Sequence, residues 1–126
     1  MSAAASMYEQ AHRQAVRVSI QDAAASLQEL LSRRVTAYLV GVGDGKTVSR
    51  WASGDVSEIR EPDTERRLRR AYEIAQLLLQ FDSPATVRAW FIGLNPQLGD
   101  VSPAEAIHDG KLQDAIIAAR AFIAGG

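Results

Sequence analysis

The sequence predicts an all-α fold, a compact multi-helix domain of about six or seven short helices, from apolar residues that recur at helical spacing. Two further observations support this prediction. Ser-Pro pairs at Ser83 and Ser102 are typical of helix starts, and glycines follow several of the apolar segments. The chain has 126 residues, of which 47% are hydrophobic and 23% charged, so it can bury a core.

The first half contains three expected helices. Residues 1–18 are rich in Ala, Ser and Gln, and we expect an N-terminal arm that is disordered or a poorly anchored helix. Ser19 is placed to cap a helix with inward positions Ala23, Ala24, Leu27, Leu30 and Leu31. Residues 34–42 are expected to be helical, although VTAYLVGV is also rich in strand formers. A glycine-rich turn then precedes a short helix over residues 47–53, with Val48 and Trp51 or Ala52 facing inward.

The second half contains four expected helices. Pro62 begins a long helix to about residue 81, with Leu68, Ala71, Tyr72, Ala75, Leu78 and Leu79 on its apolar stripe. Ser83-Pro84 begins the next helix, whose stripe is Val87, Trp90, Phe91 and Leu94, and Asn95-Pro96 ends it. Ser102 and Glu105 form a capping box for a short helix that ends at Asp109-Gly110. The last helix has the most regular stripe, formed by Leu112, Ala115, Ile116, Ala119, Phe122 and Ile123.

Composition excludes several classes of site. The chain has no cysteine, so it has no disulfide and no thiolate metal ligand. No apolar run approaches the roughly 20 residues that span a bilayer, and the N-terminus lacks the apolar centre of a secretory signal, so we expect a cytoplasmic protein. The net charge of −1 argues against non-specific binding to polyanions.

A helix-turn-helix pattern lies in the basic middle of the chain. RRVTAYLV would be the supporting helix, GVGDG the turn and KTVSRWASG the recognition helix. Arg50 can offer two parallel donors to guanine, and Lys46 and Thr47 at the helix start suit a phosphate. The residues expected to contact DNA are Lys46, Thr47, Ser49, Arg50 and Ser53. The alternative is an ordinary helical hairpin with a solvated polar face.

The basic run RRLRR at residues 66–70 has two interpretations, a solvated helix face paired with Glu65 and Glu73 or a contact to the DNA backbone. Catalytic patterns are weak: His12 and His108 lie in different segments, without a nucleophile, a carboxylate pair or a metal-binding set beside them. Gly45-Lys46-Thr47 lacks the earlier glycine of a phosphate-binding loop, because Val40 stands there. We therefore expect neither an enzyme nor a bound metal or cofactor.

Residues from about 34 to 126 resemble the MbcA/ParS/Xre-type antitoxins. The resemblance rests on VSRWASG, AYEIAQLLLQF, VRAWFIGLNPQLGD, SPAEAIHDG and the Ala-rich last helix. The positions that match the family pattern in the more specific second half are Trp90, Asn95, Pro96, Pro103, Ala106, Ile107 and Gly110. The departures are a longer N-terminal arm and the glycine-rich turn before the recognition helix.

The resemblance implies a division into the arm (1–18), an Xre-like helix-turn-helix region (19–81) and a toxin-binding region (82–126). It implies a homodimer that binds operator DNA and a RES-domain toxin, an enzyme that degrades NAD. The C-terminal segment would cover the active site of the toxin, and the expected contacts are Arg120, Phe122, Ile123, Gly125 and Gly126. The alternative is a stand-alone transcriptional regulator whose C-terminal half only dimerises.

Overall fold

The structure is a computed structural model that describes residues 3–125. Within this range every named element is a helix, which confirms the all-α prediction. There are eight α-helices and one 3-10 helix: α1 (Ala3–Arg17), α2 (Ile20–Leu31), α3 (Arg33–Val40), α4 (Gly45–Ser53), α5 (Pro62–Leu79), α6 (Pro84–Ile92), η1 (Pro96–Leu98), α7 (Pro103–His108) and α8 (Leu112–Ile123). No helix in residues 3–125 combines the length and apolar character needed to cross a bilayer.

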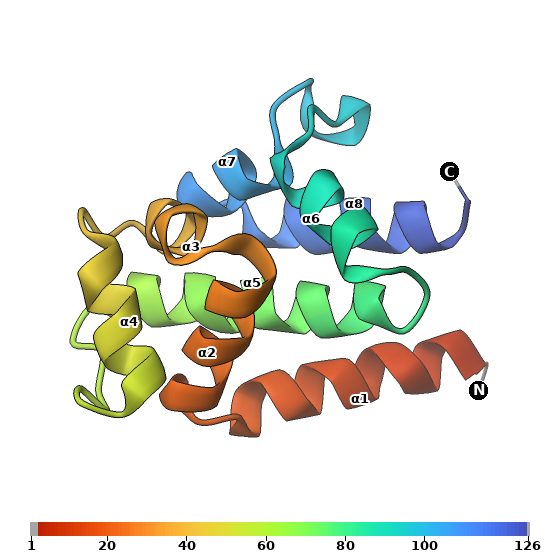
Figure 1. Cartoon of the computed structure of the whole chain (residues 1–126). Coiled ribbons are helices and arrows are strands. Elements are labelled where there is room, and N and C mark those ends of the chain that lie inside the picture. The colour runs from red at the N-terminus through yellow and green to blue at the C-terminus, as the bar shows by residue number, and fades with distance from the viewer. Residues whose placement is uncertain (1–2, 126) are drawn as a thin grey trace.

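Helix α5 is the central element of the fold (Figure 1). It packs against α1, α2, α3, α6, α7 and α8. A single cluster of buried apolar residues continues from α1 to α8. The expected boundary between residues 81 and 82 lies in the turn between α5 and α6, but the core does not divide there.

The N-terminal arm is the largest difference from the sequence prediction. Residues 3–17 form α1, which is anchored to α5 rather than loose. Ala11 and Ala15 are buried against the core, and the Arg69 guanidinium donates to the carbonyl oxygens of Ala15 and Val18, at 2.9 and 2.7 Å. These bonds satisfy carbonyl groups at the C-terminal end of α1, which a helix end otherwise leaves unpaired.

Residues 33–40 are helical despite their strand-forming composition. Ser32 caps the start, accepting a hydrogen bond from the Val35 amide, and Gly41 ends the helix with φ of 87°. The caps at Ser32 and Gly41 stabilise the helix at both ends, and burial of Ala37, Leu39 and Val40 stabilises it further. Together they outweigh the intrinsic preference of this segment for a β-strand.

The predicted apolar stripes agree with burial in most elements. In α2 the buried residues are the five predicted from the sequence, behind the Ser19 cap. Leu94 is the exception in the second half, because it is 77% exposed instead of continuing the stripe of α6. Helix α6 ends at Ile92, and an antiparallel bridge between Asn95 and Val101 turns the chain outward before a further turn of helix can form.

Candidate functional site

Helices α3 and α4 are arranged as the sequence pattern predicts, as two short helices in contact across the turn at residues 41–44. Both pack against α2, and Val48 and Trp51 bury the inner face of α4. Gly41 adopts a left-handed conformation, and a Cβ atom there would lie 3.2 Å from Nη1 of Arg67. The backbone angle of the turn therefore favours glycine at this position, whereas the space for a Cβ atom would need only a small shift of the Arg67 side chain.

Four of the five predicted DNA contacts lie on one outward side of α4. Lys46, Arg50 and Ser53 are exposed and follow one another at steps of four and three residues, which places them on one helix face. Thr47 is half-buried beside them. Ser53 Oγ donates to the carbonyl oxygen of Arg50, at 3.1 Å, so its own donor is used inside the helix.

The hydroxyl of Ser49, the remaining predicted DNA contact, has a partner within the fold. Its hydroxyl donates to Oε1 of Gln28 in α2, at 2.8 Å, and the side chain is half-buried. Ser49 therefore joins α4 to α2, and its hydroxyl is directed to Gln28 and not outward. The sequence pattern missed this role because Gln28 is 21 residues away along the chain.

The first turn of α4 is occupied by a carboxylate. Asp44 accepts a hydrogen bond from the Lys46 amide, at 2.9 Å, as the N-cap of the helix. A phosphate would have to share this position with a negative charge, so the expected phosphate contact at the helix start depends on side chains and not on free amide groups. Arg33, which was not among the expected contacts, lies along this end of α4: a Cβ on Gly45 would be 3.1 Å from its Cγ.

Several arginines of the basic run at residues 66–70 are bonded to other parts of the fold. Arg69 pairs with Glu65 in addition to the end of α1, and Arg70 lies 3.6 Å from Glu73 and donates to the carbonyl oxygen of Leu112. Arg66 forms an exposed pair with Asp63. The pairing with Glu65 and Glu73 expected for a helix face is present, but Arg69 also bonds to carbonyl groups at the end of α1, and Arg70 bonds to the first residue of α8.

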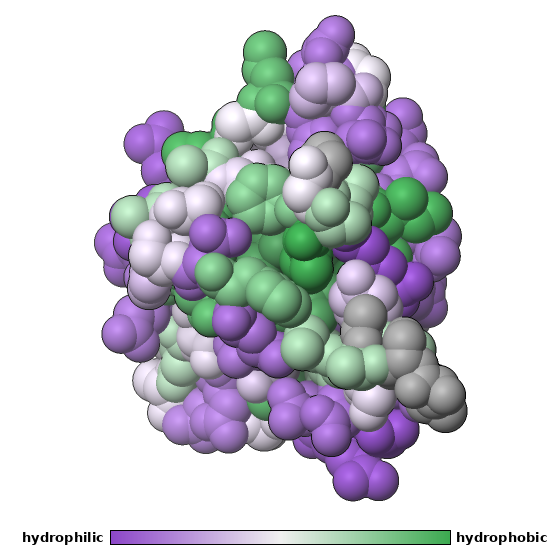
Figure 2. Space-filling model, turned by 90° about the vertical axis from the view of Figure 1, so that its right-hand side faces the viewer, coloured by the Kyte–Doolittle hydropathy of each residue, from purple (hydrophilic) through white to green (hydrophobic). Residues whose placement is uncertain are grey.

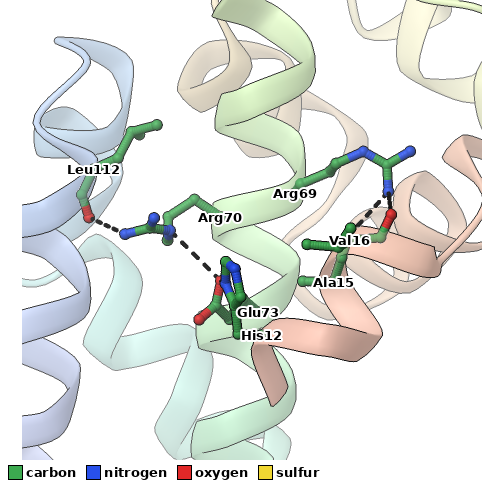
Figure 3. A network of polar contacts seen from close by, with 7 residues as sticks. All are labelled: His12, Ala15, Val16, Arg69, Arg70, Glu73 and Leu112. Carbon is green, nitrogen blue, oxygen red and sulfur yellow. Dashed lines mark hydrogen bonds and ion pairs between the residues drawn. The ribbon is translucent and has the colours of Figure 1, made fainter. Parts of the chain in front are cut away.

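A buried carboxylate connects α1 and α5 (Figure 3). Glu73 is 5% exposed, and its Oε1 accepts from Nδ1 of His12 at 3.1 Å and faces Nε of Arg70. His108, the other histidine, ends α7 as expected and lies against Tyr38. Burial and then the carboxylates of Glu105 and Asp109 raise the pKa of Tyr38. Across residues 3–125, no three histidine or carboxylate side chains gather closely enough to hold a metal ion.

The predicted toxin contacts lie at the C-terminal end of α8, but two of them are partly packed into the fold. The Phe122 ring lies 6.4 Å from the Trp90 ring, centroid to centroid, and Ile123 packs against the same core. Arg120 is directed to α1, with its guanidinium carbon 4.7 Å from the centre of the Tyr8 ring. Gly125 is exposed with φ of 83°, and Gly126 lies outside the described residues.

Apolar side chains remain accessible at this end of the molecule. Figure 2 shows them gathered at the centre of the face that carries the C-terminal ends of α5 and α8. The partly exposed apolar residues at these two ends include Phe81, Phe122 and Ile123, and we call these three the C-terminal apolar surface. Helix α4 lies at the opposite end of the molecule (Figure 1). The two candidate sites therefore do not overlap.

No family model, curated protein or solved structure matches this chain in comparisons with known proteins.

Proposed function

We propose that this protein is a non-enzymatic antitoxin that binds operator DNA through α4 and neutralises a RES-domain, NAD-degrading toxin through its C-terminal end. The observation that carries the proposal is the separation of the two candidate surfaces. The polar face of α4 and the C-terminal apolar surface lie at opposite ends of α5, so one molecule has room for DNA and a protein partner together (Figure 1).

The DNA-binding part is supported by the composition of the outward face of α4. Lys46 and Arg50 provide cations for phosphates and base edges, and Arg33 adds a third cation near the start of the helix. Because a single recognition helix reads only one half-site, the proposal includes a homodimer on a two-fold symmetric operator.

The toxin-binding part is supported by the end of α8. The last residues of the helix are apolar, and the following Ala124 and Gly125 are exposed and carry little or no side chain, which suits a narrow cleft. Inhibition would be steric: the segment would cover the NAD site of the toxin. Because Phe122 and Ile123 also contribute to this protein's core, the segment that is free to enter a cleft begins after Ile123.

The test is a pull-down of the tagged full chain from its host, followed by an NAD-consumption assay of the released partner. A partner that consumes NAD only after release supports the proposal, and recovery of the protein with DNA alone contradicts it. A variant that ends at Ile123 should bind DNA normally but neutralise the partner less well. A variant that lacks residues 121–126 is a poor test by itself, because it also removes Phe122 from its contact with Trp90.

The second candidate is a stand-alone transcriptional regulator. The observation that favours it is the packing of Phe122 and Ile123 onto the core, which gives the apolar end of α8 a role within a single chain. Under this candidate, shortening the chain to Ile123 leaves gene regulation unchanged, whereas replacing Arg50 by Ala abolishes it. The antitoxin proposal predicts a defect in both variants, in neutralisation for the first and in repression for the second.

A further inference from the structure

A groove of about 450 Å³ lies between α1 and α8, with α5 as its floor. Its charged and aromatic lining consists of Tyr8, Glu9, His12 and Arg13 from α1, Arg70 and Glu73 from α5, and Arg120 from α8. A volume of this size falls within the range of small-molecule sites, which is about 300–1,000 Å³. The groove is separate from α4, and the inference drawn from it does not depend on the proposed function.

Glu73 and Arg70, two of the charged residues in the groove, neutralise each other. The Glu73 side chain is 6% exposed and lies between His12 Nδ1 and Arg70 Nε, at 3.1 and 3.6 Å from its Oε1 (Figure 3). Arg70 also donates to the carbonyl oxygen of Leu112, at 3.0 Å. This network fixes the floor of the groove, and it uses the charge of Arg70 within the fold.

Arg120 is differently placed, because its guanidinium is held without being neutralised. The Tyr8 ring lies under the guanidinium carbon at 4.7 Å. Within residues 3–125, the side chain of Arg120 has no hydrogen bond and no ion pair. A contact with an aromatic ring uses none of the guanidinium N–H groups as hydrogen-bond donors, so these donors are available to a ligand. Two of them can bind two oxygens of a carboxylate or phosphate.

Arg13 supplies a second cation from the opposite wall. Among residues 3–125 its ion-pair partner is Glu9, one helical turn earlier, with 4.0 Å between Nη1 and Oε2, and both side chains are more than half exposed (57% and 53%). An exposed pair at this distance contributes little to stability, so a ligand anion can replace Glu9 at low cost. The groove therefore presents Arg120 and Arg13 on facing walls above a floor whose charges are balanced.

We propose that this groove binds a small molecule through an oxyanion, a phosphate monoester or a carboxylate, with Arg120 as the principal contact and Arg13 as the second cation. Tyr8 orients Arg120 from beneath, and Ile116 provides an apolar wall for the remainder of the ligand. Phosphorylated and carboxylated metabolites both carry an oxyanion that the two arginines could bind. Separate titrations with the two anions distinguish these two sources.

The experiment is a titration of the full chain, labelled with ¹⁵N, with inorganic phosphate and separately with succinate, using sodium chloride at matched ionic strength as the reference. Saturable shifts of amide signals in the facing parts of α1 and α8 are expected with one anion, and the anion that gives them identifies the source. If neither anion produces saturable shifts beyond those of chloride, the proposal is overturned.

Two variants test the assigned contact. Arg120→Gln should weaken binding at least about tenfold, because it removes a charge-assisted hydrogen-bond donor. Arg60→Gln is the matched control, since Arg60 is exposed in the loop before α5 and outside the groove, and it should bind as the parent does. Tyr8→Leu should weaken binding while retaining both arginines. Equal affinity of the Arg120→Gln and Arg60→Gln variants would contradict the assignment, provided that both give the parent's circular dichroism spectrum.

Discussion

The imidazole ring of His108 lies flat on the phenol ring of Tyr38, with 4.4 Å between the ring centroids and 5° between the ring planes. His108 Nδ1 is also 2.6 Å from the carbonyl oxygen of Tyr38, and because a carbonyl oxygen only accepts, Nδ1 carries the proton. Tyr38 belongs to α3, which packs against α4, and His108 ends α7. This contact therefore joins the candidate DNA-binding unit to the C-terminal part of the chain.

Replacing His108 should separate the two contributions of this contact. His108→Ala removes the ring and the hydrogen bond and should lower the free energy of unfolding by about 1–2 kcal/mol. His108→Phe keeps an aromatic ring on Tyr38 and removes only the hydrogen bond, so its loss should be about half as large. Urea denaturation measures both values. If the two variants are equally stable, the ring contact contributes nothing and this explanation of the junction is wrong.

Tyr38 should ionise at a higher pH than an ordinary tyrosine. Burial, followed by the charges of Glu105 and Asp109, raises its pKa above the usual value of 10.0. Since the folded state keeps the phenol proton longer than the unfolded state does, the stabilisation is complete below about pH 10 and is lost as the pH rises through the folded pKa. Tyrosinate absorbance of the parent minus that of Tyr38→Phe gives the midpoint. Replacing Glu105 and Asp109 by Gln and Asn should lower that midpoint, and an unchanged midpoint would exclude the carboxylates as a cause.

Local signals in the sequence predicted most of the fold. Ser19, Ser83 and Ser102 each cap the helix expected after them, and the apolar stripe of α2 is buried residue for residue. These features involve residues three or four positions apart, so a single sequence contains them. Ser32 is a different case: it ends α2 and begins α3 with φ of 88°, a conformation that no residue pattern at that point indicates.

Long-range contacts were the part that sequence patterns could not predict. Helix α1 is poorly patterned by itself, and its anchoring depends on Arg69, 51 to 54 residues away along the chain. The orientations of Ser49 toward Gln28 and of Arg120 toward Tyr8 likewise depend on how distant helices pack. A basic run and a polar helix face indicate where charge is available, but only the packed structure distinguishes side chains used inside the fold from those left for a partner.

Arg69 should matter far more for stability than its neighbour Arg66. The Arg69 guanidinium bonds to carbonyl oxygens at the end of α1 and to Glu65, whereas Arg66 pairs only with Asp63 on the surface. Arg69→Ala should therefore cost about 1–3 kcal/mol and speed hydrogen exchange in α1, because buried acceptors lose their donor. Arg66→Ala, the control, should change stability by less than about 0.5 kcal/mol. Similar losses in the two variants would show that Arg69 does not anchor α1.

The two polar neighbours at the centre of α4 should give opposite results in DNA binding. Arg50 is exposed on the outward face, and Arg50→Ala should weaken binding to a specific operator by about 1–3 kcal/mol if it reads a base. Ser49 donates to Gln28 inside the fold, so Ser49→Ala should leave the affinity for DNA unchanged. It should instead lower the free energy of unfolding by about 1 kcal/mol, because the hydrogen bond to α2 is lost. Fluorescence anisotropy with the operator, at one fixed salt concentration, measures the first effect, and urea denaturation measures the second. The assignment of α4 as the recognition helix fails if Arg50→Ala binds the operator as the parent does, or if Ser49→Ala loses affinity at unchanged stability.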